Sequence, residues 1–246
     1  MTRAAVLVTG ASRGIGLGIA ESLAAQGVCL TVAARKAETL ESVAARLRDL
    51  GAPEVIAVAG DMADPGHVEK LLSAHVASFD AMGALILNAG VGSAGAIAEY
   101  PLRRFDKTVA VNLRAPLQLM QSALPALRRG AVVDPERGAK IIALASITGV
   151  FAEPGLAVYG ATKAALISLI RTLNAEESGN GIAGTTISPG YVDTDMSEWA
   201  RERISQEEMI SVGDVVRVVD ALLGLSARAV VPDIVMSRAG TSGYIA

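Results

Sequence analysis

The sequence predicts an α/β protein with a three-layer, doubly wound parallel sheet of the Rossmann-like kind, about seven strands in a single domain spanning residues 1–246. Short apolar runs alternate with longer helical patterns from the first residue to about Ile187. The runs are continuously apolar, as in Ala4–Thr9, which is typical of strands covered on both faces. No repeat or Pro/Ser-rich linker divides the chain. Because each crossover contains a helix, the strands should pair in parallel.

The expected strands are short apolar runs. They are Ala4–Thr9, Val28–Ala34, Glu54–Ala59, Ala84–Asn88, Lys140–Ala145, Ala183–Ser188 and Val230–Met236. Cys29, the one cysteine of the sequence, falls in the second run and is expected to be buried there as a small hydrophobe. A single cysteine excludes an intramolecular disulfide.

The expected helices show a helical spacing of apolar residues. They are Ile15–Gln26, Ala37–Leu50, Pro65–Phe79, a long region from about Pro101 to Arg129, Leu156–Glu177 and Asp214–Leu225. Gly27 stands where a C-cap glycine is expected, and Asp64 is the N-cap candidate before Pro65. The charged segment 191–211 is interpreted as a mobile, partly helical substrate flap. It follows a strand end, where open α/β sheets bind ligands.

Composition excludes several function classes. The net charge of −3 and a pI near 5.5 provide no basic surface for nucleic acid. His67 and His75 lie in one expected helix without a cysteine cluster, so no metal site is expected. Apolar stretches are broken well before ~18 residues, so neither a signal peptide nor a membrane span is expected. We therefore expect a cytoplasmic protein.

A glycine-rich turn joins the first expected strand to the first helix. It reads Thr9–Gly10–Ala11–Ser12–Arg13–Gly14–Ile15–Gly16. Glycines allow a sharp turn and close approach to a pyrophosphate, and a helix N-terminus offers free N–H groups and a favourable dipole. The spacing is G-x-x-x-G-x-G and differs from the common G-x-G-x-x-G fingerprint. An ordinary tight turn is the alternative interpretation.

The second strand indicates which dinucleotide would bind. An acidic residue that would bind the adenosine ribose is absent there, because the strand ends Ala33–Ala34–Arg35–Lys36. Arg13 and Arg35 would instead pair with the 2′-phosphate of NADP(H). Two such bonds would give roughly a tenfold to thousandfold preference for the phosphorylated cofactor. The alternative is that Arg35 and Lys36 are only solvated charges at a helix start.

Tyr159 and Lys163 lie four residues apart in an expected helix and therefore share one face. An ammonium about 4 Å from the phenol would favour phenolate by up to ~4 kcal/mol at an effective dielectric near 20. That is about three pKa units, enough for general acid–base work. Ser146 closes the preceding strand at the same edge. Taken alone, a Y-x-x-x-K pair is common by chance.

These motifs occur together in a recognisable order. Thr9-Gly-x-x-x-Gly14-x-Gly16, Asn88–Ala–Gly90, Asn112, Ser146, Tyr159-x-x-x-Lys163 and Pro189–Gly190 follow one another along essentially the whole chain. In this order and spacing the chain resembles the short-chain dehydrogenase/reductase family, in its single-domain branch. The nearest likeness is to 3-oxoacyl-[acyl-carrier-protein] reductases and related carbonyl reductases.

The resemblance implies roles for individual residues. Tyr159 would be the general acid/base, Ser146 would hydrogen-bond the substrate oxygen, and Lys163 would hold the nicotinamide ribose and lower the Tyr159 pKa. Asn112, in a helix that Pro116 should kink, would hold a water of a proton relay. The implied cofactor-binding residues are Gly10, Ser12, Arg13, Gly14, Ile15, Gly16, Arg35, Asp61, Met62, Asn88, Ala89, Gly90, Tyr159, Lys163, Pro189, Gly190, Val192 and Thr194.

The chain departs from the family pattern in two places. Leu87 stands where many members have a further asparagine. The C-terminus, Ser237–Ala246, lacks the Asp–Gly–Gly common in acyl-carrier-protein reductases, which weighs against an acyl-thioester substrate.

The expected function is therefore an NADP(H)-dependent oxidoreductase, a ketone or 3-oxoacyl reductase, acting on a small-molecule carbonyl or secondary alcohol. The alternatives are a catalytically silent NADP(H)-binding sensor or scaffold, and a sugar-nucleotide epimerase or dehydratase of the extended branch. The substrate pocket should be bordered by Phe151, Ala152, Glu153, Tyr191, Met196, Trp199 and Ala200. That mixture allows acyl thioesters, cyclic ketones, steroids and quinones.

The long apolar helices also suggest self-association. Pro101–Arg129 and Leu156–Glu177 are richer in Ala, Leu and Ile than one sheet face needs. Paired helix faces suit a symmetric dimer, and the family resemblance implies a homotetramer. The alternative is that both helices are merely buried within one subunit.

Overall fold

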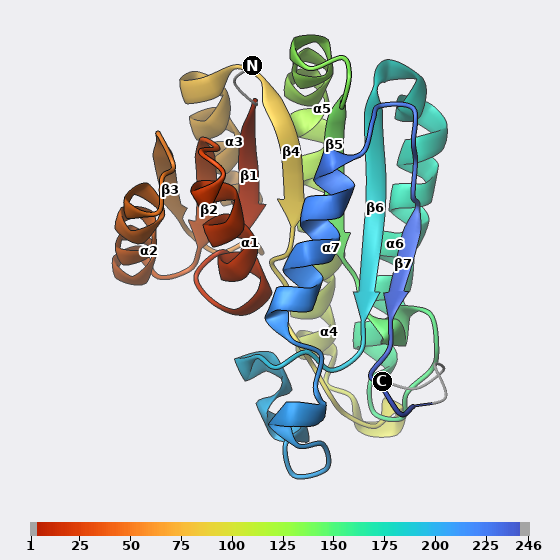
Figure 1. The fold of residues 1–246 in the computed structure, drawn as a ribbon. Coiled ribbons are helices and arrows are strands. Elements are labelled where there is room, and N and C mark those ends of the chain that lie inside the picture. The colour runs from red at the N-terminus through yellow and green to blue at the C-terminus, as the bar shows by residue number, and fades with distance from the viewer. Residues whose placement is uncertain (1–3, 242–246) are drawn as a thin grey trace.

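The computed structural model describes residues 4–241 and shows one twisted sheet in which every pair of neighbouring strands is parallel (Figure 1). The strand order is β3-β2-β1-β4-β5-β6-β7. Within the described residues this confirms the expected fold class and number of strands. The strands are β1 (Ala5–Thr9), β2 (Leu30–Ala34), β3 (Val55–Ala59), β4 (Met82–Leu87), β5 (Ala139–Leu144), β6 (Ile182–Pro189) and β7 (Asp233–Met236).

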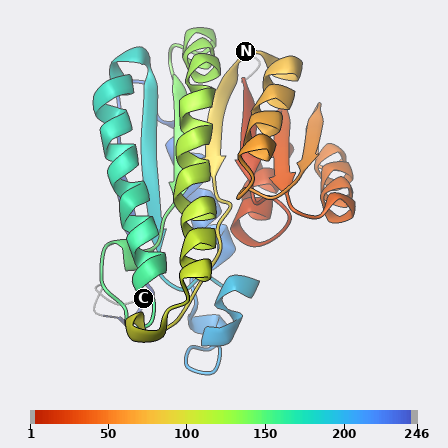
Figure 2. The ribbon, with the colours of Figure 1, turned by 180° about the vertical axis from the view of Figure 1, so that it is seen from behind.

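Helices cover both faces of the sheet (Figures 1 and 2). They are α1 (Gly14–Ala25), α2 (Ala37–Asp49), α3 (Pro65–Phe79), α4 (Leu102–Val109), α5 (Ala115–Val133), α6 (Ala157–Glu177) and α7 (Val212–Gly224). The chain builds the sheet outward from β1 to β3, then crosses back to β4 on the other side of β1. As a result α1, α2 and α7 share one apolar core, and α3, α5 and α6 share a second on the opposite face.

Small residues let the helices approach the sheet closely. All five residues of β1 and all eight of β6 are buried, as expected for strands packed on both faces. Gly130 of α5 lies so close to the Met82 carbonyl that a Cβ at this position would overlap it. This contact fixes α5 against β4, and with it the segment that leads to the carboxyl edge of the sheet.

The region from Pro101 to Arg129 differs from its prediction as one helical stretch. It consists of α4, a π-helical turn at Ala110–Arg114, and α5. Pro116 has no N–H to donate to the carbonyl of Asn112, four residues earlier, so the regular α-helical pattern cannot continue across this point. The expected irregularity at Pro116 is thus realised as a widened turn that contains Asn112.

Two expected strands start two or three residues later than predicted. Val28 and Cys29 precede β2, because the Val28 N–H still bonds to the Leu23 carbonyl at the end of α1. The prediction that Cys29 is a buried strand residue was therefore wrong: Cys29 is only partly buried. The last strand begins after Pro232, whose missing N–H excludes it from a ladder.

The helix caps follow the sequence prediction. The Asp64 side chain accepts a hydrogen bond from the Gly66 N–H at the start of α3. Gly27 follows α1 with a φ of +72°, a left-handed conformation that favours glycine.

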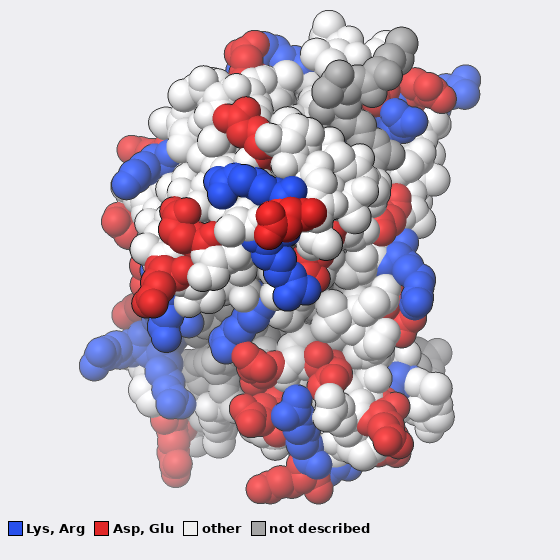
Figure 3. Space-filling model, turned by 60° about the vertical axis from the view of Figure 1, so that its left-hand side comes forward, with Lys and Arg blue, Asp and Glu red and all other residues white. Residues whose placement is uncertain are grey.

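Charge on the surface is mixed, since Lys and Arg are interspersed with Asp and Glu on the face in Figure 3. None of the helices within residues 4–241 combines the length and apolar character needed to cross a bilayer. The same residues contain no cluster of three or more His, Cys, Asp or Glu side chains suited to a metal ion.

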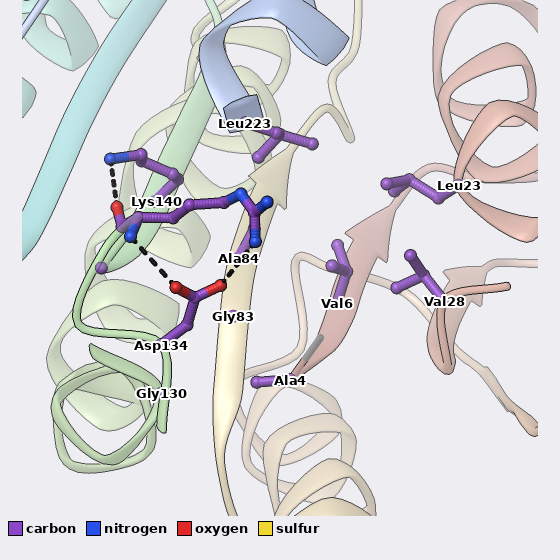
Figure 4. Close-up of a pocket in the computed structure, with 12 residues that line it drawn as sticks. Ala4, Val6, Leu23, Val28, Gly83, Ala84, Gly130, Asp134, Lys140 and Leu223 are labelled. Carbon is purple, nitrogen blue, oxygen red and sulfur yellow. Dashed lines mark hydrogen bonds and ion pairs between the residues drawn. The ribbon is translucent and has the colours of Figure 1, made fainter. Parts of the chain in front are cut away.

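A small cavity of about 40 Å³ lies at the amino edge of the sheet, between the starts of β1, β4 and β5 (Figure 4). Asp134 and Arg137 form an ion pair of 3.0 Å there, and Lys140 Nζ donates to the Arg137 carbonyl at 2.6 Å. Burial lowers the pKa of Lys140. This cavity has room only for water-sized molecules and is too small for an organic ligand.

Candidate active site

The large cavity lies at the carboxyl edge of the sheet and has a volume of about 590 Å³. Its walls come from the loops that follow β1 to β6 and from the segment 191–199. Open parallel sheets bind ligands at this edge, beside the point where the strand order reverses. In this protein the reversal falls between β1 and β4, whose loops both line the cavity.

Hydrogen bonds tie the two loops at the reversal together. Thr9 Oγ1 accepts from the main-chain N–H groups of Asn88 and Ala89, both at 3.0 Å. Asn88 Nδ2 donates to the carbonyls of Thr9 and Gly10 at 3.0 and 3.1 Å. Asn88 is thus a scaffold of the glycine turn as well as part of the cavity wall.

The glycine turn has the shape of an anion cradle. Gly10 and Gly14 have φ values of +68° and +55°. Arg13 is the N-cap of α1, and its side chain makes no capping hydrogen bond, so the first N–H groups of the helix face the cavity without a side-chain acceptor. Backbone donors at the positive end of a helix fit a pyrophosphate. The residues present therefore fit a dinucleotide.

Gly16 contributes to this cradle from behind. A Cβ at Gly16 would overlap the Gly10 carbonyl and Asn88 Nδ2, so only glycine permits α1 to pack against the turn. Gly16 does not line the cavity. In the structure Gly16 therefore packs behind the turn.

Charged side chains gather around the loops after β1, β2 and β3. Arg35 is exposed and lines the cavity beside Asp61. Asp61 Oδ2 accepts from Lys107 Nζ at 2.6 Å, and this bond, followed by the N–H of Ala63, lowers the pKa of Asp61. Arg13 forms an ion pair of 2.8 Å with Asp195. Arg35 lines the cavity and forms no ion pair with any described residue.

The segment 191–211 is partly helical, as expected. It contains short 3₁₀ helices at Asp195–Ala200 and Gln206–Glu208 and has its own small core. Ala200 belongs to that core together with Ile204 and Met209, so its expected place on the cavity wall was wrong. The Arg13–Asp195 ion pair connects this segment to the glycine turn.

Ser146, Tyr159 and Lys163 all line the same cavity. Ser146 lies near the start of the loop after β5, at the N-cap of a 3₁₀ turn over Ile147–Gly149, and its Oγ accepts from Thr148 Oγ1 at 2.9 Å and from the Thr148 N–H at 3.2 Å. Lys163 Nζ donates to the Leu144 carbonyl at 2.6 Å and lies 5.6 Å from the centre of the Tyr159 ring. The structure thus brings together the three side chains that the sequence selected.

The pKa of Tyr159 differs from the sequence expectation, because it is raised rather than lowered. Burial raises the pKa of Tyr159 to about 12, although a hydrogen bond with Ser146 lowers it in part. Burial lowers the pKa of Lys163 to about 8. The cost of burying a phenolate exceeds the stabilisation by Ser146, while the Lys163 ammonium donates to the Leu144 carbonyl. Tyr159 therefore keeps its proton at neutral pH.

Asn112 lies behind the cavity wall and is 1% exposed. Its Oδ1 accepts from the Val91 N–H at 2.9 Å, and its Nδ2 donates to the Val91 carbonyl at 3.0 Å. Gly90 lies between Asn112 and Lys163. A Cβ at Gly90 would lie 3.5 Å from Asn112 Oδ1 and 3.7 Å from Lys163 Nζ. Asn112 therefore orders the loop after β4 through its side chain.

Most of the remaining expected residues line the cavity, and a few do not. On the cavity wall lie Ser12, Ile15, Met62, Ala89, Gly90, Glu153, Pro189, Gly190, Tyr191, Val192, Thr194, Met196 and Trp199. Phe151 and Ala152 do not line it, because the loop after β5 presents Glu153 to the cavity in their place. Of the C-terminal stretch Ser237–Ala246, residues 242–246 lie outside the described part of the chain.

Sequence reasoning missed four residues that support the site. Thr9 stood in the glycine motif, and Thr148 stands two residues after Ser146, so local signals for both existed. Lys107 and Asp195 pair with Asp61 and Arg13 over separations of 46 and 182 residues, and no local pattern indicates such partners.

The fold and the site define a dinucleotide-binding α/β protein with a Ser–Tyr–Lys group at the carboxyl edge of its sheet. The family model for short chain dehydrogenases matches residues 4–205. The chain is 33% identical over 240 residues to a 2-(R)-hydroxypropyl-CoM dehydrogenase from Xanthobacter autotrophicus, with 92% of each chain covered. It is 30% identical over 214 residues to a Staphylococcus aureus 3-oxoacyl-[acyl-carrier-protein] reductase, covering 86% of this chain and 83% of the relative.

Solved structures agree. A short chain dehydrogenase from Burkholderia cenocepacia in complex with NADP superposes with a TM-score of 0.84 at 30% identity, covering 96% of each chain. A Brucella melitensis 3-oxoacyl-[acyl-carrier protein] reductase in complex with NAD gives 0.85 at 27% identity, again over 96% of each chain. The protein belongs to the short chain dehydrogenase family of oxidoreductases, which use nicotinamide cofactors.

The burial of Lys163 predicts a pH dependence of stability. The folded state releases the Lys163 proton near pH 8, whereas an unfolded chain keeps it to about 10.5, so the unfolded state binds more protons between these values. The free energy of unfolding should rise across this window by up to about 3 kcal/mol from this group. Denaturant titrations from pH 7.5 to 10 measure the slope.

The slope should be lost in Lys163→Met and kept in Lys70→Met, which removes an exposed ammonium from α3. A Lys163→Met protein with the slope of the parent would show that Lys163 is not buried as a cation.

Proposed function

We propose that the protein is an NADP(H)-dependent carbonyl reductase that transfers hydride between the nicotinamide and a ketone or secondary alcohol. One observation carries this proposal: Ser146, Tyr159 and Lys163 share a single cavity with an uncapped helix N-terminus behind a glycine turn. A catalytically silent sensor or scaffold would not need this group. The same cavity would hold a small-molecule carbonyl or alcohol beside the Ser–Tyr–Lys side chains.

The chain's own residues would bind, orient and protonate the substrate. Ser146 Oγ would hold the carbonyl oxygen, and Tyr159 Oη would donate the proton that the oxygen needs as it becomes an alcohol. Tyr159 enters this step as a neutral phenol, which agrees with its raised pKa. When bound, NADPH supplies the hydride, and the positive ring of NADP⁺ favours phenolate in the reverse direction.

Lys163 would orient the nicotinamide ribose and connect Tyr159 to a proton relay. Because both polar atoms of the Asn112 side chain bond to Val91, a relay water would be held by the main chain of the π-helical turn rather than by the amide. The missing N–H of Pro116 leaves the Asn112 carbonyl without its α-helical donor. This geometry supports for Asn112 the role that the family resemblance implies.

The preference for NADP(H) would come mainly from Arg35. Arg13 already pairs with Asp195, whereas Arg35 is exposed at the cavity without an ion pair among the described residues. A guanidinium forms strong charge-assisted bonds with phosphate. The Burkholderia neighbour is in complex with NADP, which supports this preference, whereas the Brucella neighbour is in complex with NAD.

We also propose that the protein is cytoplasmic and self-associates, as a homodimer or homotetramer. Large apolar side chains are exposed on α4 and at the start of α5, namely Leu102, Phe105 and Leu117. Sedimentation at micromolar concentration should show dimers or tetramers, and a pure monomer would refute the assembly.

The central test is NADPH oxidation over a panel of β-ketoacyl thioesters, cyclic ketones, diketones and quinones. At least one class should be turned over by the parent protein. Tyr159→Phe should lower that rate by about 10²- to 10⁴-fold, because it removes the proton donor while keeping the ring. Tyr100→Phe, which removes a hydroxyl outside the cavity wall, is the matched control.

NADPH binding without turnover of any carbonyl class would favour the silent sensor. A rate in Tyr159→Phe equal to that of the parent would show that the proton comes from another group.

Reversing the charge at Arg35 should change cofactor preference. Arg35→Asp should weaken NADPH binding roughly tenfold to a thousandfold more than NADH binding, because only NADPH loses a phosphate contact and gains a repulsion. Titration calorimetry gives the dissociation constants of both cofactors. Arg103→Asp, an equal charge reversal on the exposed face of α4, should leave their ratio unchanged. Equal losses for NADPH and NADH in Arg35→Asp would exclude Arg35 as the source of the preference.

A further inference from the structure

One carboxylate on the cavity wall has no role in the proposed chemistry. Glu153 lies in the loop between β5 and α6 and lines the cavity together with Tyr191, which follows β6. Tyr191 Oη donates to Glu153 Oε1 at 2.7 Å. The two residues therefore hold each other at the carboxyl edge, on the β5–β6 side of the sheet.

The second oxygen of this carboxylate lacks a partner. Glu153 Oε2 is buried and accepts no hydrogen bond from any described residue. Glu153 also forms no ion pair within the described chain. A buried carboxylate oxygen without a donor is costly, and a buried charge without a counter-charge is more so. The site is therefore complementary to a group that brings both a donor and a positive charge.

The surroundings of Tyr191 hold this arrangement in place. Its ring packs edge-on against Trp199, with ring centres 5.7 Å apart, and Arg203 lies over the Trp199 ring at 5.2 Å. Burial, and next the hydrogen bond to Glu153, raise the pKa of Tyr191 to about 12, while Arg203 lowers it in part. The phenol thus stays protonated, and its one proton is committed to Oε1. Arg203, the nearby cation, stacks on the Trp199 ring and forms no ion pair with Glu153.

The position of Glu153 assigns it to the substrate half of the cavity. The proposed NADP(H) phosphate site lies after β2, and Glu153 lies after β5. β1 and β4 separate these strands, so three strand spacings, about 14 Å, separate the two loops. Glu153 follows Ser146 by seven residues in the same loop. A group bound at Glu153 would therefore belong to the molecule whose carbonyl oxygen lies at Ser146.

We propose that Glu153, held by Tyr191, is a specificity-determining residue that binds an ammonium group of the substrate, so that the preferred substrate is an amino ketone. This inference rests on the proposed reductase function and adds the class of substrate. The ammonium supplies the missing donor to Oε2 and the missing positive charge. Carbonyl compounds with a carboxylate in the same place are disfavoured by repulsion.

The test uses three ketones with one carbon skeleton that end in an ammonium, a methyl or a carboxylate group. The parent should show a kcat/KM for the ammonium ketone about tenfold to a hundredfold above that for the methyl ketone, and lowest for the carboxylate. Glu153→Gln should remove most of this preference. Glu202→Gln, the same change at an exposed position outside the cavity wall, should keep it. Glu153→Lys should reverse the order and favour the carboxylate ketone, a gain that a damaged fold cannot produce.

Calorimetry separates this inference from the proposed function. Binding of the ammonium ketone to the protein saturated with NADP⁺ should weaken tenfold or more in Glu153→Gln, whether or not any ketone is reduced. Turnover of the methyl ketone with no ammonium preference, or a preference that survives Glu153→Gln, would overturn the role of Glu153 and leave the reductase proposal standing. Tight, Glu153-dependent binding without NADPH oxidation would instead retain the ammonium site and refute the reductase.

Discussion

The candidate site depends on one buried ammonium group. Lys163 Nζ donates to the Leu144 carbonyl at the end of β5, a bond that joins α6 directly to the carboxyl edge of the sheet. Two glycines make this contact close: a Cβ at Gly149 would meet the Lys163 backbone, and a Cβ at Gly160 would meet the Thr148 carbonyl. The turn that carries Ser146 is thereby packed against the helix that carries Tyr159 and Lys163.

A series of charged side chains lines the cavity. Arg13 and Arg35 lie on the loops after β1 and β2, beside Asp195 and Asp61, and Glu153 lies on the loop after β5. An elongated anionic cofactor fits the first part of this series, and a cationic substrate fits the last. Hydrogen bonds of Thr9 and Asn88 join the loops after β1 and β4, which lie between these charges. The two ends of the cavity therefore favour ligand groups of opposite charge.

Much of the fold could be predicted because its signals are local. Apolar runs such as Ala5–Thr9, the Asp64 cap and the Gly27 stop each depend on a few neighbouring residues. The Ser146, Tyr159 and Lys163 grouping could be predicted because Tyr159 and Lys163 share a helix face, Ser146 follows a strand at the carboxyl edge, and the motif order resembles that of the family. The partners of Asp61 and Arg13, and the π-helical turn at Asn112, depend on tertiary contacts that no local pattern specifies.

The ionisation of Tyr159 was also beyond sequence reasoning. The four-residue spacing to Lys163 indicates proximity, yet it gives neither the burial of the phenol nor the direction in which the ammonium is held. In the structure the desolvation of the phenol outweighs its hydrogen bond with Ser146. A bound cofactor, together with Lys163, would therefore be needed to lower the pKa of the Tyr159 phenol toward neutral pH.

The most direct measurement is a spectroscopic titration of the Tyr159 phenol, obtained as the difference between the parent protein and Tyr159→Phe. The account predicts a pKa of about 12 in the protein alone and a fall of about two units or more when NADP⁺ is saturating. The fall should be smaller in Lys163→Met. A Tyr159 pKa that is the same with and without NADP⁺ would contradict the account.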